Sequence, residues 1–245
     1  MRLALSTEAA PELPLADLVA ACVRRGLAAL ELVDGDGHGL SPARPAEARE
    51  RLRTALAGSG ITVAAFRARS LERACSAEMA AFAAAIGAPV VAPAGTAGDE
   101  VLEAARVYAG AGAMLLLAHG ADPERVEALR ALVEAAPAGS LGLAWDVEPA
   151  EELSPVVAPV LQAAGPWLRH IQLRGGGPEA MGQEGRGIGV LAARLTLAGY
   201  DGTMALAPST PRYRYAWGAW LGRRGGWGCG SKSAGPAPLR REDTD

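Results

Sequence analysis

The sequence predicts an α/β protein built as a single eight-stranded β/α barrel. Eight short apolar runs occur along the chain, and most begin about 25 to 28 residues after the one before, the length of one βα unit. Between them lie longer segments rich in Ala and Leu that are typical of helices. Uninterrupted alternation of strand and helix implies parallel strands joined by right-handed crossovers. The 245 residues suffice for one such barrel without a second domain.

The eight predicted strands are short apolar runs, several of them continuous, as expected for strands of a parallel sheet that are buried on both faces. They are expected at residues 2–6, 28–33, 61–66, 88–93, 113–118, 141–146, 168–173 and 203–208. Spacing alone also allows an open, doubly wound sheet. Eight consecutive βα units nevertheless favour closure into a barrel.

Capping signals support helices between these strands. Ser76 and Asp122 are expected N-caps, and Pro45 is suited to a first helical turn. Gly26 and Gly87 are suited to the residue that ends a helix. The expected helices cover residues 14–26, 45–60, 76–87, 122–136 and about 188–198, with a final helix at 213–222.

Composition excludes several classes of protein. The formal charge of −3 gives no sign of nucleic-acid binding, which favours a basic stripe. Lys232 is the sole lysine and lies near the end of the chain, so no buried lysine is available for Schiff-base chemistry. Three cysteines in a chain of this size indicate a reducing, cytoplasmic location. No apolar stretch is long enough for a membrane span or a signal peptide.

The composition changes after about Gly222, where Gly, Ser, Pro and charged residues replace the apolar pattern. We therefore expect a barrel domain at 1–222 and a flexible tail at 223–245. The tail contains Trp227 and Cys229 in a Gly-rich segment. An exposed cysteine there is accessible to chemistry, so a recognition segment for a protein partner is the alternative to plain disorder.

Polar side chains follow the expected strands at their carboxyl ends, where the active sites of β/α barrels form. Strand 28–33 contains Glu31 and is followed by Asp34, Asp36 and His38, while Arg67 and Arg69 follow strand 61–66. The later strands contribute His119, Asp146, Glu148, His170, Gln172 and Arg174. His170 and Gln172 are two residues apart on one strand and therefore share a face.

The chain resembles xylose isomerase-like TIM barrels, the sugar phosphate isomerase and epimerase family, over roughly residues 1–210. The likeness begins in LSTEAAPELPLADLVAACVRRGLAALELVDGDGHG, where Glu31 and His38 occupy positions that the family uses. It continues in LRTALAGSGITVAAF, AAAIGAPVVAPAG, LGLAWD, LRHIQLRGG and GYDGTMALAPS. These segments are specific as a set, although no single one is diagnostic.

The resemblance implies a divalent metal site at the barrel mouth that polarises a sugar carbonyl or hydroxyl group. The family takes a Glu from the fifth strand, an Asp and a nearby His from the sixth, a His from the seventh and a Glu from the eighth. Here Asp146 matches, whereas the other four positions hold Ala118, Pro149, Gln172 and Ala207. We therefore expect a degenerate metal site and no bound metal or other cofactor. A relocated site made by His119, His170 and Glu148 stays open as an alternative.

The resemblance and the strand-end positions together give the expected site. Glu31 or Asp146 as base and His38 as acid form the candidate catalytic set, and Arg67, His119, Gln172, Arg174 and Arg186 the substrate-binding set. The Gly-rich segment 175–189 is either a phosphate cradle, to which Arg174 and Arg186 contribute, or an ordinary loop. For Glu31 the alternative is a structural carboxylate paired with Arg67 or Arg69, and for His38 it is turn chemistry.

Two functions follow from these features. The first is a sugar or sugar-phosphate isomerase- or epimerase-like protein that binds a small polyhydroxylated ligand at the barrel mouth, without nucleic-acid or membrane partners. The missing ligands leave its catalytic competence open. The second is a non-catalytic barrel that acts as a scaffold or presents its C-terminal tail to a protein partner.

Overall fold

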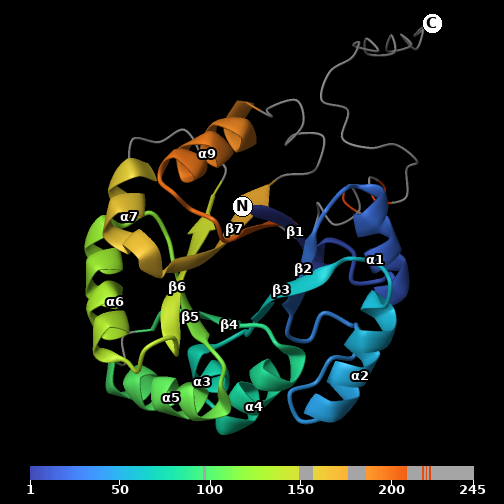
Figure 1. Cartoon of the computed structure of the whole chain (residues 1–245), viewed down its shortest axis with the longest axis horizontal. Helices are drawn as coiled ribbons and strands as arrows, with labels where there is room; N and C mark the ends of the chain where they lie inside the picture. Colours follow the sequence, from blue (N-terminus) through green and yellow to red (C-terminus); the bar gives the residue numbers. More distant parts are fainter. Residues whose placement is uncertain are drawn as a thin grey trace, which may run out of the picture.

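The computed structural model describes residues 1–95, 98–148, 157–175 and 186–208, together with residues 217, 219 and 221 and with the backbone alone for 186–190. All eight strands are parallel and form one closed barrel in sequence order, because β1 pairs with both β2 and β8. Figure 1 shows the barrel surrounded by the helices. The predicted fold, a single eight-stranded β/α barrel, is confirmed.

Each predicted strand occurs within two residues of its expected bounds. The strands are β1 (Arg2–Ser6), β2 (Ala29–Val33), β3 (Thr62–Arg67), β4 (Val90–Pro93), β5 (Leu115–His119), β6 (Leu141–Val147), β7 (Leu168–Gly175) and β8 (Thr203–Pro208). Two register shifts interrupt the pairing, one at Leu30/Glu31 in β2 and one at Leu143/Ala144 in β6.

The helices predicted from capping signals are α1 (Leu15–Arg24), α2 (Pro45–Leu56), α4 (Ala77–Ile86), α6 (Pro123–Ala135) and α9 (Arg186–Leu197). Three helices were not predicted from the sequence: α3 (Leu71–Ala74), α5 (Gly98–Ala111) and α7 (Val157–Ala164). Most of the predicted final helix at 213–222 lies outside the described residues. Short 3₁₀ helices occupy Thr7–Ala9 and Gly165–Trp167. Within the described residues, no helix is both long and apolar enough to cross a membrane.

Two of the predicted N-caps are confirmed by hydrogen bonds. The Ser76 hydroxyl accepts from the Met79 backbone N–H at 3.1 Å, and the Asp122 carboxylate accepts from two backbone N–H groups at the start of α6. Gly87 ends α4 with a φ of 67°, in the left-handed region that only glycine adopts without strain. Local chemistry therefore fixes these helix ends before any tertiary contact forms.

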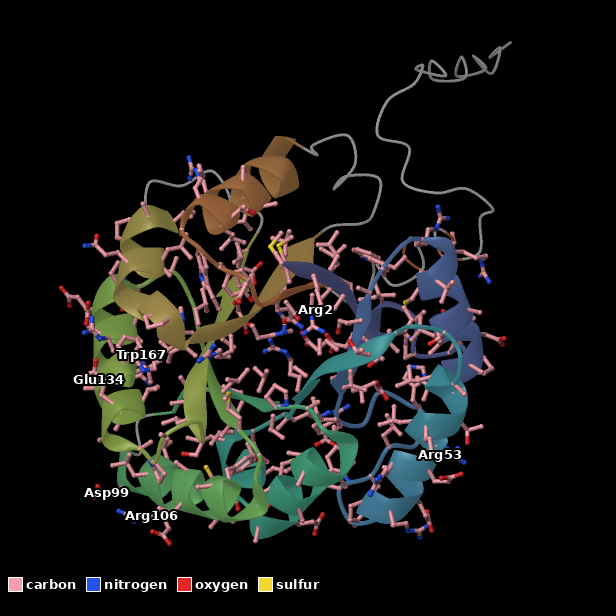
Figure 2. All side chains as sticks on the ribbon, viewed as in Figure 1. Arg2, Arg53, Asp99, Arg106, Glu134 and Trp167 are labelled. Carbon is pink, nitrogen blue, oxygen red and sulfur yellow. The ribbon has the colours of Figure 1, made fainter. Side chains whose placement is uncertain are left out.

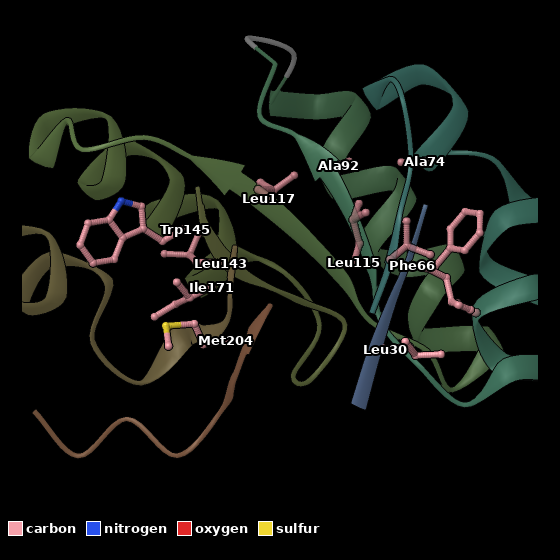
Figure 3. Close-up of a cluster of buried hydrophobic side chains, with 14 of the residues drawn as sticks. Leu30, Phe66, Ala74, Ala92, Leu115, Leu117, Leu143, Trp145, Ile171 and Met204 are labelled. Atoms are coloured by element: carbon pink, nitrogen blue, oxygen red, sulfur yellow. The ribbon is translucent and has the colours of Figure 1, made fainter. Parts of the chain in front are cut away.

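The outer face of the barrel carries the large apolar side chains. Leu30, Phe66, Leu115 and Trp145 are fully buried in the cluster shown in Figure 3. The Phe66 ring meets that of Phe82 from α4 edge to face, with 4.7 Å between the centroids. Charged side chains such as Arg53, Arg106 and Glu134 lie on the outside of the helix ring, as Figure 2 shows.

The inner face of the barrel carries much smaller apolar side chains, because successive strand residues alternate between the two faces. Two separate clusters form there, one of Ala4, Ala29, Ala64 and Ala205, the other of Ala65, Val91, Leu116, Ala118 and Ala144. The consecutive residues Ala64 and Ala65 are an exception to the alternation, because the pairing of β2 with β3 shifts its register and skips Ala64. Alanine fills little of the barrel interior. Space therefore remains towards the carboxyl ends of the strands for long polar side chains.

The proposed tail at 223–245, with Trp227 and Cys229, lies outside the described residues, as does most of the Gly-rich segment 175–189. The boundary at residue 222 stays a prediction. Just before it, the side chain of Leu221 is fully buried, and Arg24 Nη2 of α1 donates to the Leu221 backbone carbonyl at 3.5 Å. The last described residues thus pack against the first helix.

Candidate functional site

Glu31 of β2 lies inside the barrel with none of its surface exposed. Its Oε1 accepts hydrogen bonds from Arg67 Nε at 2.9 Å and from Gln172 Nε2 at 2.6 Å. Its Oε2 lies 2.7 Å from His170 Nε2. Three side chains from two other strands, β3 and β7, therefore converge on this one carboxylate.

The charge of Glu31 follows from these partners. Burial by itself raises the pKa of the carboxyl group, but the Arg67 charge and the contact with His170 outweigh it and lower the pKa from 4.5 to about 2. Glu31 is therefore ionised at neutral pH. An ionised carboxylate can only accept hydrogen bonds, so His170 carries a proton on Nε2.

Arg67 connects the buried Glu31 to the more exposed Asp146. Its Nη1 and Nη2 donate to the two oxygens of Asp146 at 3.1 and 2.7 Å. The Arg67 side chain is 9% exposed and that of Asp146 is 29% exposed, so the pair leads from the barrel interior to its mouth. The sequence left open whether Glu31 pairs with Arg67 or with Arg69, and in the structure it pairs with Arg67. Arg69 instead donates to the carbonyls of Asp34 and Gly35, at 2.7 and 3.0 Å.

A cavity of about 480 Å³ opens above this network. Its size lies within the roughly 300–1,000 Å³ of small-molecule sites. The strand ends supply most of its wall. The lining residues are Glu8, Val33, Arg67, Ala68, Arg69, Pro93, Ala94, Ala118, His119, Gly120, Asp146 and Arg174.

The structure brings together some of the expected site residues and separates others. Arg67, His119, Asp146 and Arg174 line the cavity. Glu31 and Gln172 are fully buried and contact the network beneath it. Glu31, Gln172 and His38 do not line this cavity. Arg186 is the first residue of α9, and its side chain lies outside the described part of the chain. Their assigned roles stay predictions.

His119 at the end of β5 has a defined hydrogen-bonding role. Its Nδ1 lies 2.8 Å from the backbone carbonyl oxygen of Gly120, which can only accept, so Nδ1 carries a proton. Burial lowers the pKa of the ring, although the Gly120 carbonyl and the charge of Asp146 partly oppose this effect. The ring is therefore neutral at pH 7. Its Nε2, buried and without a partner among the described residues, is an acceptor.

The loop after β2 is organised by turn chemistry. Asp36 accepts from the backbone N–H groups of Val33 and His38, at 3.3 and 3.0 Å, and from the Thr7 hydroxyl. The His38 ring is buried, with its Nε2 4.0 Å from Asp36. These contacts agree with the alternative interpretation of His38, namely that it stabilises its own loop.

Two strand-end residues noted in the sequence were left out of the expected catalytic and substrate-binding sets, yet contribute to this site. His170 contacts Glu31 directly, and Arg69 lines the cavity. His170 shares a face of β7 with Gln172 and Arg174, and this alternation placed it inside the barrel on sequence alone. Arg69 lies beyond the end of β3, where strand alternation does not predict the direction of a side chain.

The residues at the expected metal positions do not fit a divalent cation. Ala118 and Ala207 provide no ligand atoms, and the Gln172 amide nitrogen donates to Glu31. Both oxygens of Asp146 face the guanidinium of Arg67, whose positive charge opposes a second cation at this place. Among the described residues, no group of three or more His, Cys, Asp and Glu side chains could hold a metal ion.

Comparison with known proteins adds evidence on the fold. No family model and no curated protein sequence matches the chain. Solved structures do match: Escherichia coli 3-keto-D-glucoside 4-epimerase has a TM-score of 0.61 at 12% identity, over 90% of this chain and 98% of that one. An L-ribulose 3-epimerase has a TM-score of 0.63 at 14% identity, over 86% and 82%.

A xylose isomerase domain-containing protein from Salmonella typhimurium is similar as well, with a TM-score of 0.58 at 13% identity over 91% of this chain and 95% of that one. The chain therefore has the xylose isomerase-like TIM-barrel fold found in several sugar epimerases. The resemblance seen in the sequence is confirmed at the level of the fold.

Proposed function

We propose that this xylose isomerase-like barrel binds a small polyhydroxylated ligand, a sugar or a sugar derivative, in the cavity at the carboxyl ends of its strands. The observation that carries the proposal is the cavity itself, where groups of complementary hydrogen-bonding character meet. Asp146 and neutral His119 offer acceptors, and Arg67 and Arg174 carry donors. A ligand with several hydroxyl groups can use both kinds at once.

The two acceptors, Asp146 and His119, give the stronger support for a ligand that carries hydroxyl groups. His119 Nε2 is buried and has no hydrogen-bond partner among the described residues. An unsatisfied buried acceptor costs free energy, and a hydrogen bond from a ligand removes this cost. A ligand hydroxyl supplies such a hydrogen bond. Asp146 is already held in one orientation by Arg67, so no side-chain ordering is needed when a ligand binds to its remaining lone pairs.

We further propose that the chain binds this ligand without metal-assisted isomerisation. The expected metal positions do not fit a cation. Of the three residues expected to act as acid or base, only Asp146 lines the cavity. Glu31 lies beneath it, ionised and with donors from three side chains. These observations support a binding protein built on an epimerase fold.

Isothermal titration calorimetry with neutral hexoses, pentoses and their phosphates tests the proposal. Asp146→Asn removes the charged acceptor, and we expect at least roughly tenfold weaker binding, as for loss of a charge-assisted hydrogen bond. Asp99→Asn, on the exposed surface of α5, is the matched control and leaves the affinity unchanged. Thermal unfolding of each variant establishes that it is folded. Failure of the whole panel to bind, or equal binding by Asp146→Asn, contradicts the proposal.

A further inference from the structure

We propose that the ligand of this cavity carries one carboxylate group, that it is a sugar acid, and that Arg174 binds this carboxylate. The inference rests on the proposed function and narrows its class of ligand. It depends on three properties of the cavity wall: one guanidinium without a partner among the described residues, the balance of charges around it, and the order of the polar groups along the rim.

Arg174 lies near the end of β7, two residues after Gln172 and four after His170. These three side chains share the inner face of the strand, and Arg174 is the one that lines the cavity. Its side chain is half-buried. The described residues supply no hydrogen-bond or ion-pair partner for its guanidinium, which keeps its donors available for a ligand.

The other two arginines of the cavity are already engaged. Arg67 donates from all three of its nitrogens, to Glu31 and to both oxygens of Asp146. Arg69 donates from Nε and Nη2 to two loop carbonyls. Arg174 is therefore the arginine whose planar pair of N–H groups can receive a carboxylate in the bidentate arrangement that arginine favours.

The charge balance distinguishes a carboxylate from a phosphate. Three arginines and two carboxylates, Glu8 and Asp146, line the cavity, and His119 is neutral. The wall thus carries three positive and two negative charges, and the ionised Glu31 just beneath it brings the two signs into balance. A single carboxylate is the smallest negative charge that an anionic ligand can add to these groups. A phosphate monoester, with a charge of about −1.5 to −2 at pH 7, places more negative charge beside Asp146 than a carboxylate does.

The polar groups also follow one another around the rim. His119, Asp146 and Arg174 belong to β5, β6 and β7, which are consecutive in the barrel. Two acceptors are therefore followed by the guanidinium on three neighbouring strands, so one ligand that carries both hydroxyl groups and a carboxylate can contact all three side chains.

Calorimetry with three ligands that differ only at carbon 6 tests the inference: D-glucose, D-glucuronate and D-glucose 6-phosphate. We expect glucuronate to bind at least tenfold more tightly than either of the others. Arg174→Gln reduces the affinity for glucuronate to that for glucose in the same variant. Arg169→Gln is the matched control, because Arg169 is exposed near the opposite end of the same strand. It keeps the preference for glucuronate.

The outcomes separate this inference from the proposed function. Equal binding of glucose and glucuronate, tightest binding of the phosphate, or a preference for glucuronate that survives in Arg174→Gln overturns the carboxylate assignment. If the carboxylate assignment fails in one of these ways but glucose still binds, and Asp146→Asn weakens the binding of glucose, the proposed function stands while the inference falls. If none of the three ligands binds, both fall. Tight glucuronate binding that depends on Arg174 and not on Arg169 supports both.

Discussion

Arg67 donates two hydrogen bonds to the carboxylate of Asp146, from Nη2 at 2.7 Å and from Nη1 at 3.1 Å. Its third nitrogen donor, Nε, points the other way along the barrel and reaches Glu31 at 2.9 Å. One internal cation therefore bridges two carboxylates, Glu31 from the neighbouring strand β2 and Asp146 from β6 across the barrel. This arrangement lies at the barrel mouth, where β/α-barrel enzymes place catalytic groups, and we expect Arg67 to be important for stability and for the proposed binding.

Replacement of Arg67 by methionine strongly destabilises the fold. The fully buried, ionised Glu31 then loses the charge that offsets its burial, and a broken buried ion pair costs about 3–5 kcal/mol. Chemical denaturation measures the change in the free energy of unfolding. The control is Arg53→Met, which breaks an exposed pair with Glu50 on α2 and has little effect because solvent already screens that pair. Equal effects of the two exchanges contradict this prediction.

The double variant Glu31→Gln with Arg67→Met recovers much of the lost stability. It removes the buried negative charge together with its partner, and a buried pair replaced by neutral groups is often tolerated. The amide introduced at position 31 keeps an acceptor for His170, and its amino group can donate to the Gln172 side-chain oxygen once the Gln172 amide turns over. We expect the double variant to unfold at a higher denaturant concentration than Arg67→Met alone. A double variant that is less stable than the single one shows that the uncompensated charge is not the cause.

Stability of the protein falls in acid partly through Glu31. Its pKa in the folded state, about 2, lies below the value of 4.5 expected in the unfolded chain. The ionised group therefore stabilises the fold fully above about pH 4.5, and this stabilisation is lost as the pH falls towards 2. This pKa shift corresponds to roughly 3 kcal/mol in the free energy of unfolding. Glu31→Gln, compared with wild type across this window, has the flatter profile of unfolding free energy; parallel profiles contradict the assignment.

We expect binding of the proposed ligand to depend on pH through His119. Burial lowers the pKa of its ring below 6.5, so Nε2 is an acceptor at neutral pH and becomes a donor once the ring is protonated at lower pH. We therefore expect the affinity for a neutral sugar to decrease as the pH is lowered through the depressed pKa of the ring, below 6.5. His119→Gln keeps an acceptor that does not titrate. Calorimetry on this variant is expected to show a ligand affinity that changes less with pH than that of the wild type. If the affinity of the variant depends on pH as strongly as that of the wild type, His119 is not the titrating group.

We expect the purified protein to contain well below one equivalent of divalent metal. The fifth and eighth strands present Ala118 and Ala207 at the expected ligand positions, and Arg67 already satisfies the charge of Asp146. Elemental analysis measures the content, and EDTA leaves the midpoint of thermal unfolding unchanged. A stoichiometric, tightly held manganese or zinc ion, lost together with stability on addition of EDTA, contradicts our view of the site.

The sequence by itself determined the barrel. Short apolar runs specified the eight strands because both faces of a closed parallel sheet are buried, and Ser76 and Asp122 specified helix starts because capping is local. Helix α5 was not predicted although it covers Gly98–Ala111. It follows no N-cap as clear as those two.

The tertiary structure decided which polar groups meet. Glu31 and His170 are 139 residues apart, and only closure of the barrel places them 2.7 Å from each other. It also decided that Glu31 pairs with Arg67 and not with Arg69, because Arg67 ends β3 on its inner face while Arg69 lies beyond the strand. Side-chain direction and distance in space, which no linear pattern contains, set these partners and with them the charge of the cavity.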